Sequence, residues 1–182
     1  MSWEHALLDL FDHLEARADG LAQERREEDV ADLARAEYAD VGLAERLHGS
    51  VGRTVVLEVA GGTRLRGRLE RVGRGCAAVR PAEKAVLHLV NLDHVLTVAT
   101  DSARAVASST MPVTSRLGLA SAVRHLTEEV DVVVVRLVDG RTVSGQVVRV
   151  GADFLEVLRE KEAAEGALVL VPFAAVVTLA PA

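Results

Sequence analysis

Arginine recurs at every second position of one short stretch of the chain. Arg64, Arg66 and Arg68 alternate with Leu65 and with Gly67 before Leu69. A period of two places the guanidinium groups on one face of a strand and the apolar side chains on the other. Guanidinium groups bind phosphate oxygens through two parallel hydrogen bonds. The pattern therefore predicts an anion- or nucleic-acid-binding stripe, which Arg71, Arg74 and Arg80 extend.

Two other interpretations of this arginine stripe remain open. It could pair with acidic residues, since acids outnumber bases in residues 1–50 of this chain, or it could simply face solvent. The net charge of −6 and an aromatic content of 3% both argue against tight RNA binding, which uses basic surfaces and stacking rings.

No arrangement typical of an enzyme is present. Cys76 is the only cysteine and has no base at a suggestive spacing, so we expect a packed core thiol. His5, Asp9 and His13 share one face of a predicted helix, but no further ligand completes a metal shell. There is no phosphate-binding glycine loop or nucleophile elbow. We predict neither catalytic activity nor a cofactor nor a metal.

The N-terminal part of the chain has helical periodicity. Apolar residues recur on one face of residues 3–46, and the surrounding positions are strongly acidic. Such a stripe needs a partner, which would be either a second copy of the chain or the domains that follow. The stripe, a candidate self-association helix, consists of Trp3, Leu7, Leu10, Phe11, Leu14 and Leu21.

The remainder of the chain is an internal repeat. Residues 55–79 align without a gap on residues 133–157, at an offset of about 78 positions. A second match, with a slightly larger offset, pairs residues 87–98 with residues 168–179. Between the copies lies a Ser/Thr-rich linker, residues 101–115.

Each copy has the alternating pattern of short strands joined by glycine turns. Gly62 and Gly140 belong to predicted hairpin turns, whereas Gly67 and Gly145 lie inside strands, where a strand bends or another backbone approaches closely. A short helix, opening at Gly42 or Gly118, precedes each copy. The predicted strands are 54–59, 63–71, 75–80, 85–90 and 94–100 in the first copy, and 130–138, 142–150, 153–159, 167–171 and 175–179 in the second.

A short helix followed by five bent strands resembles the Sm-like family, which includes the bacterial Hfq proteins. Residues 132–158 resemble the first motif of that family, and residues 168–179 resemble its second motif. The resemblance covers both copies and implies two closed barrels that associate through their edge strands. Other small barrels of the SH3 type share the same bent strands and glycine hairpins.

The residues that bind RNA in this family are not matched. The loop after the second strand has Gly73 and Ala77 in the first copy, and Gly151 and Leu155 in the second. The basic-glycine pair of the second motif is replaced by 90–91 (Val-Asn) and 171–172 (Val-Pro). Phe154 and Phe173, which could stack on bases, occupy core positions. The resemblance thus supports a fold rather than the best-known activity of the family.

From these patterns we expect an α+β, mainly β chain: a helical segment (1–40), a first Sm-like five-stranded barrel (41–100), a linker (101–115) and a second such barrel (116–182). The expected function is that of a non-enzymatic scaffold acting through self-association, with a dimer favoured, or through protein contacts. The alternative is a nucleic-acid-binding regulator that uses the arginine stripe. No signal peptide and no apolar run of about 18 residues is recognisable, so we expect a soluble, cytoplasmic protein without membrane contact.

Overall fold

The computed structural model describes Arg17, Asp32, Arg35, Ala36 and residues 38–82, 86–102, 117–159 and 167–182. The chain divides into two units, Met1–Val41 and Gly42–Ala182. The predicted self-association stripe (Trp3, Leu7, Leu10, Phe11, Leu14 and Leu21) lies outside the described residues, as does most of the predicted linker. Among the described residues, none of the helices combines the length and the apolar character that crossing a bilayer requires.

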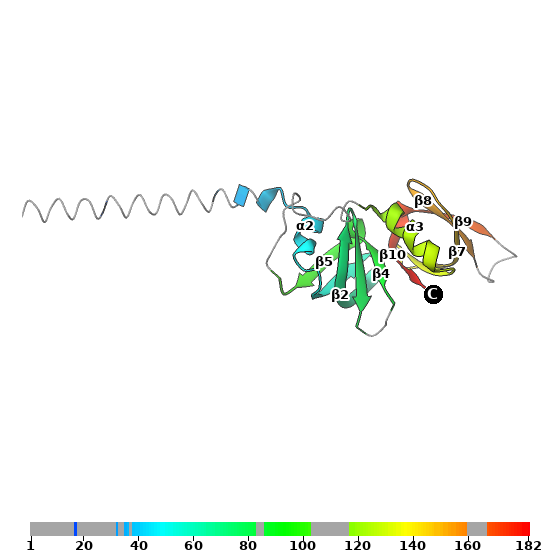
Figure 1. Ribbon diagram of the computed structural model, residues 1–182, viewed down its shortest axis with the longest axis horizontal. Coiled ribbons are helices and arrows are strands. Elements are labelled where there is room, and N and C mark those ends of the chain that lie inside the picture. The colour runs from blue at the N-terminus through cyan, green and yellow to red at the C-terminus, as the bar shows by residue number, and fades with distance from the viewer. Residues whose placement is uncertain are drawn as a thin grey trace, which may run out of the picture. The chain divides into compact units, whose positions relative to one another are not determined.

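In its described residues the second unit contains two helices and ten strands. They form two sets that follow the internal repeat (Figure 1). The first set comprises α2 (Leu43–His48), β1 (Thr54–Val59), β2 (Thr63–Gly73), β3 (Cys76–Pro81), β4 (His88–Asn91) and β5 (Val95–Thr100). The second comprises α3 (Leu119–Glu129), β6 (Val133–Leu137), β7 (Thr142–Val150), β8 (Phe154–Arg159), β9 (Leu168–Pro172) and β10 (Val176–Pro181). Short 3-10 turns join the strands at Ala60–Gly62 (η1), Leu92–His94 (η2) and Phe173–Ala175 (η5).

The prediction of two closed Sm-like, SH3-type barrels is wrong. All ten strands form a single open antiparallel sheet in the order β5-β1-β2-β3-β4-β10-β6-β7-β8-β9. The reason is the pairing of β4 with β10, which places Val90 opposite Thr178 and Leu89 opposite Leu179. Because β4 bonds the other repeat, it does not return to β5, and the first set of strands stays open. The edges of the sheet are β5 and β9.

Alternation along the strands places the apolar residues inside. In β2, Leu65 and Leu69 are buried while the intervening arginines are exposed. Gly67 lies where a Cβ atom would meet the carbonyl of Arg80, so its lack of a side chain lets β3 approach closely. Gly145 has the same relation to Leu158 in the second repeat. At the hairpins, Gly62 and Gly140 have φ of 71° and 84°, which favours glycine.

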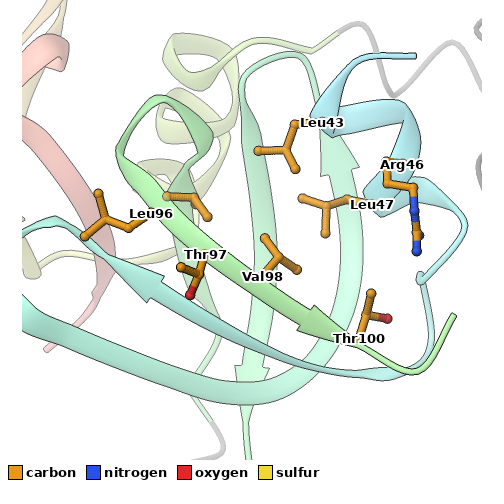
Figure 2. Close-up of a pocket in the computed structure, with 8 residues that line it drawn as sticks. Leu43, Arg46, Leu47, Leu96, Thr97, Val98 and Thr100 are labelled. Atoms are coloured by element: carbon orange, nitrogen blue, oxygen red, sulfur yellow. The ribbon is translucent and has the colours of Figure 1, made fainter. Parts of the chain in front are cut away.

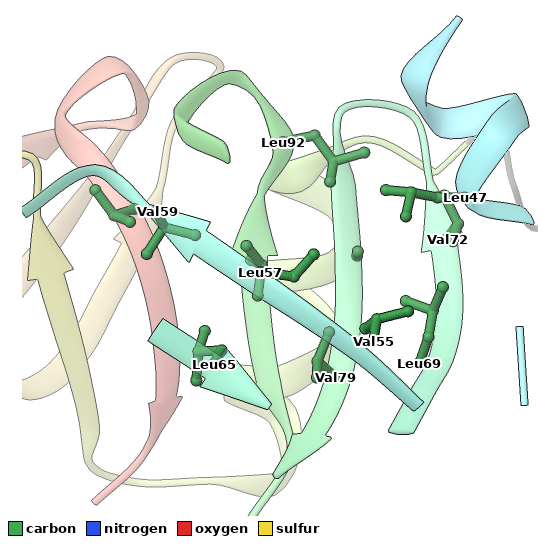
Figure 3. Close-up of a cluster of buried hydrophobic side chains, with 12 residues drawn as sticks. Leu47, Val55, Leu57, Val59, Leu65, Leu69, Val72, Val79 and Leu92 are labelled. Carbon is green, nitrogen blue, oxygen red and sulfur yellow. The ribbon is translucent and has the colours of Figure 1, made fainter. Parts of the chain in front are cut away.

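Each repeat has its own apolar core, and the two cores exchange one residue each. The first core is built mainly from leucine and valine side chains of α2, of β1 to β4 and of η2 (Figure 3), and partly buried valines of β5 pack against it. It also includes Val177 from β10, in the second repeat. Conversely, Leu89 from β4 packs against the second core. The junction between the repeats is therefore an apolar interface as well as a backbone pairing.

Candidate functional site

A groove of about 310 Å³ lies between α2 and the edge strand β5 (Figure 2). Five of its eight lining residues are apolar. The residues that line it are Leu43, Arg46, Leu47, Val95, Leu96, Thr97, Val98 and Thr100. An apolar groove beside an unpaired strand edge is a typical place for an added strand.

Polar contacts fix α2 beside the end of β5. Arg46 donates to the Ser102 carbonyl, and the hydroxyls of Ser50 and Thr100 lie 2.9 Å apart. Ser102 in turn donates to the Gly49 carbonyl at 3.0 Å. Leu47 is buried in the first core, and Leu43, one turn earlier on the same face, is exposed above the groove. The helix is therefore held in place without covering the whole floor.

In the part of the chain that the structure describes, strand β5 is hydrogen-bonded on one side only, to β1. Leu96 on this strand is 68% exposed, a high value for a leucine within a strand. At the opposite edge, β9 also exposes leucines: Leu170 is 59% exposed, and Leu168 lies opposite another exposed leucine, Leu158 of β8. Both edges of the sheet thus combine unpaired backbone with exposed apolar side chains.

The intrachain junction shows how such edges pair in this protein. Beyond the two backbone pairs of β4 and β10, Asn91 donates from Nδ2 to the carbonyls of Phe173 (3.2 Å) and Val176 (3.0 Å). Nε2 of His94 lies 2.8 Å from the Ala174 carbonyl, to which it donates. His94 therefore has a structural role at the junction.

The internal repeat makes the junction and the free edges comparable. In the alignment, Leu96 of β5 matches Val177 of β10, and Leu170 of β9 matches Leu89 of β4. Val177 is fully buried in the first core, whereas Leu96 is exposed. Leu89 packs against the second core, whereas Leu170 is exposed. The residues equivalent to those that form the junction inside the chain are thus exposed at the two edges of the sheet.

The arginine stripe occupies the outer face of β2, as its alternation predicts. Arg64, Arg66 and Arg68 are exposed, and their neighbours on β1 are Glu58, Val56 and Thr54 respectively. The Glu58 carboxylate accepts a hydrogen bond from the Thr97 hydroxyl at 2.8 Å. Within the described ranges, no carboxylate forms an ion pair with any of the three arginines.

A fourth arginine lies beside the stripe. On β3, Arg80 is directly opposite Arg68, and its Nε lies 3.3 Å from the Glu70 carboxylate. Arg71 and Arg74, which the sequence adds to the stripe, are also exposed. The stripe is therefore a real surface feature of the first repeat, with one like-charge pair across strands.

The buried thiol is unsuited to chemistry. Cys76 is 4% exposed, which confirms the prediction of a core cysteine. Burial raises the pKa of the Cys76 thiol to about 11, partly offset by a hydrogen bond with the Gly73 backbone. The thiol is thus protonated at neutral pH. Within the described residues, no three His, Cys, Asp or Glu side chains are grouped as metal ligands, while His5, Asp9 and His13 lie outside that part of the chain.

The groove was missed by reasoning from the sequence. Leu96 stands in a run of alternating apolar residues like that of any other strand, so its type gives no sign of exposure. Phe154 and Phe173 are half-buried, and Phe173 packs against the second core.

Comparisons with known proteins add no family to this description. Neither a model of a protein family nor a curated protein matches the chain.

Proposed function

We propose that this chain is a non-enzymatic interaction protein that assembles head to tail, with β9 of one copy pairing with β5 of the next. The observation that carries the proposal is the contrast between equivalent residues: Val177 and Leu89 are covered at the intrachain junction, and Leu96 and Leu170 are uncovered at the edges. At each edge, a second copy would supply a paired strand and apolar contacts, as the other repeat does at the junction inside the chain.

The intrachain register predicts the register between copies. At the intrachain junction Val90 is opposite Thr178, and the equivalent pair between copies is Val171 opposite Thr97 of the next copy. Likewise Leu89 is opposite Leu179 inside the chain, and the equivalent pair is Leu170 opposite Val98 of the next copy. In this register Leu170 approaches the groove between α2 and β5. Fully burying a leucine stabilises by about 1.5–3 kcal/mol, and two edges contribute several such side chains.

Pairing between two different edges is heterologous, so it generates either a closed ring or an open filament. The smallest closed form is a dimer in which each copy uses both of its edges. We favour this dimer because it leaves no exposed leucine edge that would recruit further copies.

Molar mass measured by light scattering tests the proposal on the full chain. The wild type should form an assembly at micromolar concentration, and Leu96→Lys or Leu170→Lys should weaken it at least tenfold. Val148→Lys is the matched control, because Val148 is an exposed apolar residue on β7, away from both edges. A wild type that stays monomeric at high concentration would refute the proposal.

Mixing the variants tests the head-to-tail arrangement. Leu96→Lys retains an intact β9 edge and Leu170→Lys retains an intact β5 edge, so an equimolar mixture should form a heterodimer through one junction. If removal of residues 1–40 abolishes assembly while both lysine variants still assemble, the N-terminal segment and not the sheet edges drives association.

The arginine stripe supports a second candidate function, nucleic-acid binding. The specific observation is that Arg64, Arg66 and Arg68 lie exposed on one face of β2 and that, among the described residues, none of the three forms an ion pair, so a polyanion can contact all three guanidinium groups. The test is fluorescence anisotropy with oligo(U) and oligo(A) at two salt concentrations. Binding should weaken with salt and be lost in the Arg64/Arg66/Arg68→Ala variant. Arg141→Ala combined with Arg149→Ala, two exposed positions in the second repeat, is the control.

A further inference from the structure

A second cavity, of about 270 Å³, lies over the three strands that join the repeats, β4, β10 and β6. Its apolar walls include Val86, Val134 and Ala180, and its polar lining residues are His88, Arg136 and Thr178. The volume lies just below the range of about 300–1,000 Å³ typical of pockets for drug-sized ligands. The cavity therefore suits a small molecule with an apolar body.

Arg136 supplies the positive charge of this cavity. It is half-buried on β6, and its Nη1 lies 3.5 Å from the Gly140 carbonyl oxygen, at the long limit of a hydrogen bond. Among the residues that the structure describes, no carboxylate forms an ion pair with it. Directly opposite on β10 stands Thr178, whose side chain is buried and lines the same cavity.

In the first repeat, the same pair of positions holds an acid in place of the arginine, and there the two side chains are hydrogen-bonded to each other. Glu58 and Thr97 are the residues equivalent to Arg136 and Thr178, and they too are opposite each other, on β1 and β5. There the Thr97 hydroxyl donates to the Glu58 carboxylate at 2.8 Å, so the pair satisfies itself. In the second repeat a donor group, the guanidinium, replaces the acceptor. A carboxylate placed in the cavity would be an acceptor for the threonine and the arginine together.

We propose that this cavity binds a small monocarboxylate with an apolar body. The carboxylate accepts two hydrogen bonds from the Arg136 guanidinium, whose planar fork matches it, and one from the Thr178 hydroxyl. The apolar part of the ligand lies against Val86, Val134 and Ala180. Among the described lining residues Arg136 is the one arginine or lysine, and a single guanidinium among mostly apolar residues favours one negative charge over the higher charge and additional acceptors of a phosphate. The site lies within one chain and is independent of the proposed self-association.

Titration calorimetry with hexanoate and benzoate as probes tests this proposal on the full chain. We expect both to bind, hexanamide and benzamide to bind at least tenfold more weakly, and Arg136→Gln to weaken carboxylate binding at least tenfold. Arg141→Gln is the matched control, because Arg141 is a neighbouring exposed arginine paired with Asp139. The Leu96→Lys variant should bind hexanoate like the wild type, which separates this site from the assembly edges.

Each of three results with the carboxylate probes would overturn the proposal. They are the absence of binding by either carboxylate at millimolar concentration, equal binding of acid and amide, and binding unchanged by Arg136→Gln. Tighter binding of inorganic phosphate than of hexanoate would also overturn the assignment to monocarboxylates. If Arg136→Gln does not fold, Thr178→Val, which removes only the hydroxyl at the same shape, must weaken hexanoate binding several-fold, and an unchanged affinity refutes the proposal.

Discussion

Asn91 and Pro172 occupy equivalent positions at the ends of β4 and β9, but only Asn91 carries an amide that joins the two repeats. Its side chain holds the carbonyls of Phe173 and Val176 across the junction. Proline has no side-chain donor and no backbone N–H. The intrachain junction therefore has a polar clamp that the proposed junction between copies lacks, so assembly should be weaker than the union of the repeats.

Pro172→Asn should strengthen self-association. In the register of the intrachain junction, the new amide would reach the carbonyls of Leu92 and Val95 in the next copy, which are equivalent to those of Phe173 and Val176. Two hydrogen bonds contribute about 0.5–1.5 kcal/mol each, so the dissociation constant should fall about tenfold. Sedimentation equilibrium measures it. Pro172→Ala, which removes the proline without adding the amide, is the control, and an equal effect of both variants would contradict the clamp.

Asn91→Ala should destabilise the folded chain. It removes the two hydrogen bonds across the junction and the one that Asn91 Oδ1 accepts from the Asp93 N–H. It leaves the Val176 carbonyl buried without the Asn91 donor, at a cost of about 1–3 kcal/mol in the free energy of unfolding. Urea unfolding followed by circular dichroism measures the loss. His125→Ala, an exposed change on α3, is the control and should leave the midpoint unchanged. An unchanged free energy of unfolding in Asn91→Ala would mean that water fully replaces the hydrogen bonds of the amide.

Local patterns in the sequence were sufficient to place the strands. The predicted strands 54–59 and 142–150 coincide with β1 and β7, because alternation and glycine turns are properties of neighbouring residues. The short helices that open after Gly42 and Gly118 are likewise present. The exposed arginine stripe also follows directly from a period of two.

The order of the sheet could not be predicted in the same way. Pairing of β4 with β10 uses backbone groups that every strand offers, so residue types do not distinguish it from closure of each repeat on itself. For this reason the chain was expected to form two barrels, and the groove beside Leu96 was missed. Leu96 and Val177 are similar apolar residues at equivalent positions, and only the sheet order makes one exposed and the other buried.

Gly67→Ala should destabilise the protein more than Gly62→Ala. At Gly67 a Cβ atom would come within 2.8 Å of Pro81 Cα, so β2 and β3 would have to separate at a cost of about 3 kcal/mol. At Gly62 the surroundings are open, and the cost of about 1–2 kcal/mol comes from a φ of 71° alone. Thermal unfolding compares the two variants. The reverse order would mean that the strands separate easily at Gly67.

The stability of the chain should fall at high pH through Cys76. The thiol pKa is raised from 9.0 to about 11 by burial in the folded state. Below pH 9 both states hold the proton, and the contribution of Cys76 to stability is constant. Above pH 9 the unfolded state ionises first, so stability declines until the pH reaches about 11, where the folded thiol also ionises.

Urea unfolding between pH 8 and pH 10.5, with Cys76→Ala as the matched variant, isolates this effect. The difference in unfolding free energy between wild type and variant should shrink as the pH rises above 9, because alanine has no proton to lose. At pH 8 the thiol of the folded wild type should react slowly with a disulfide reagent, since the thiolate is the reactive form. The same thiol should react rapidly once the protein is unfolded in urea. A pH-independent difference together with rapid labelling of the folded chain would show that the thiol is accessible to solvent, contrary to its burial in the structure.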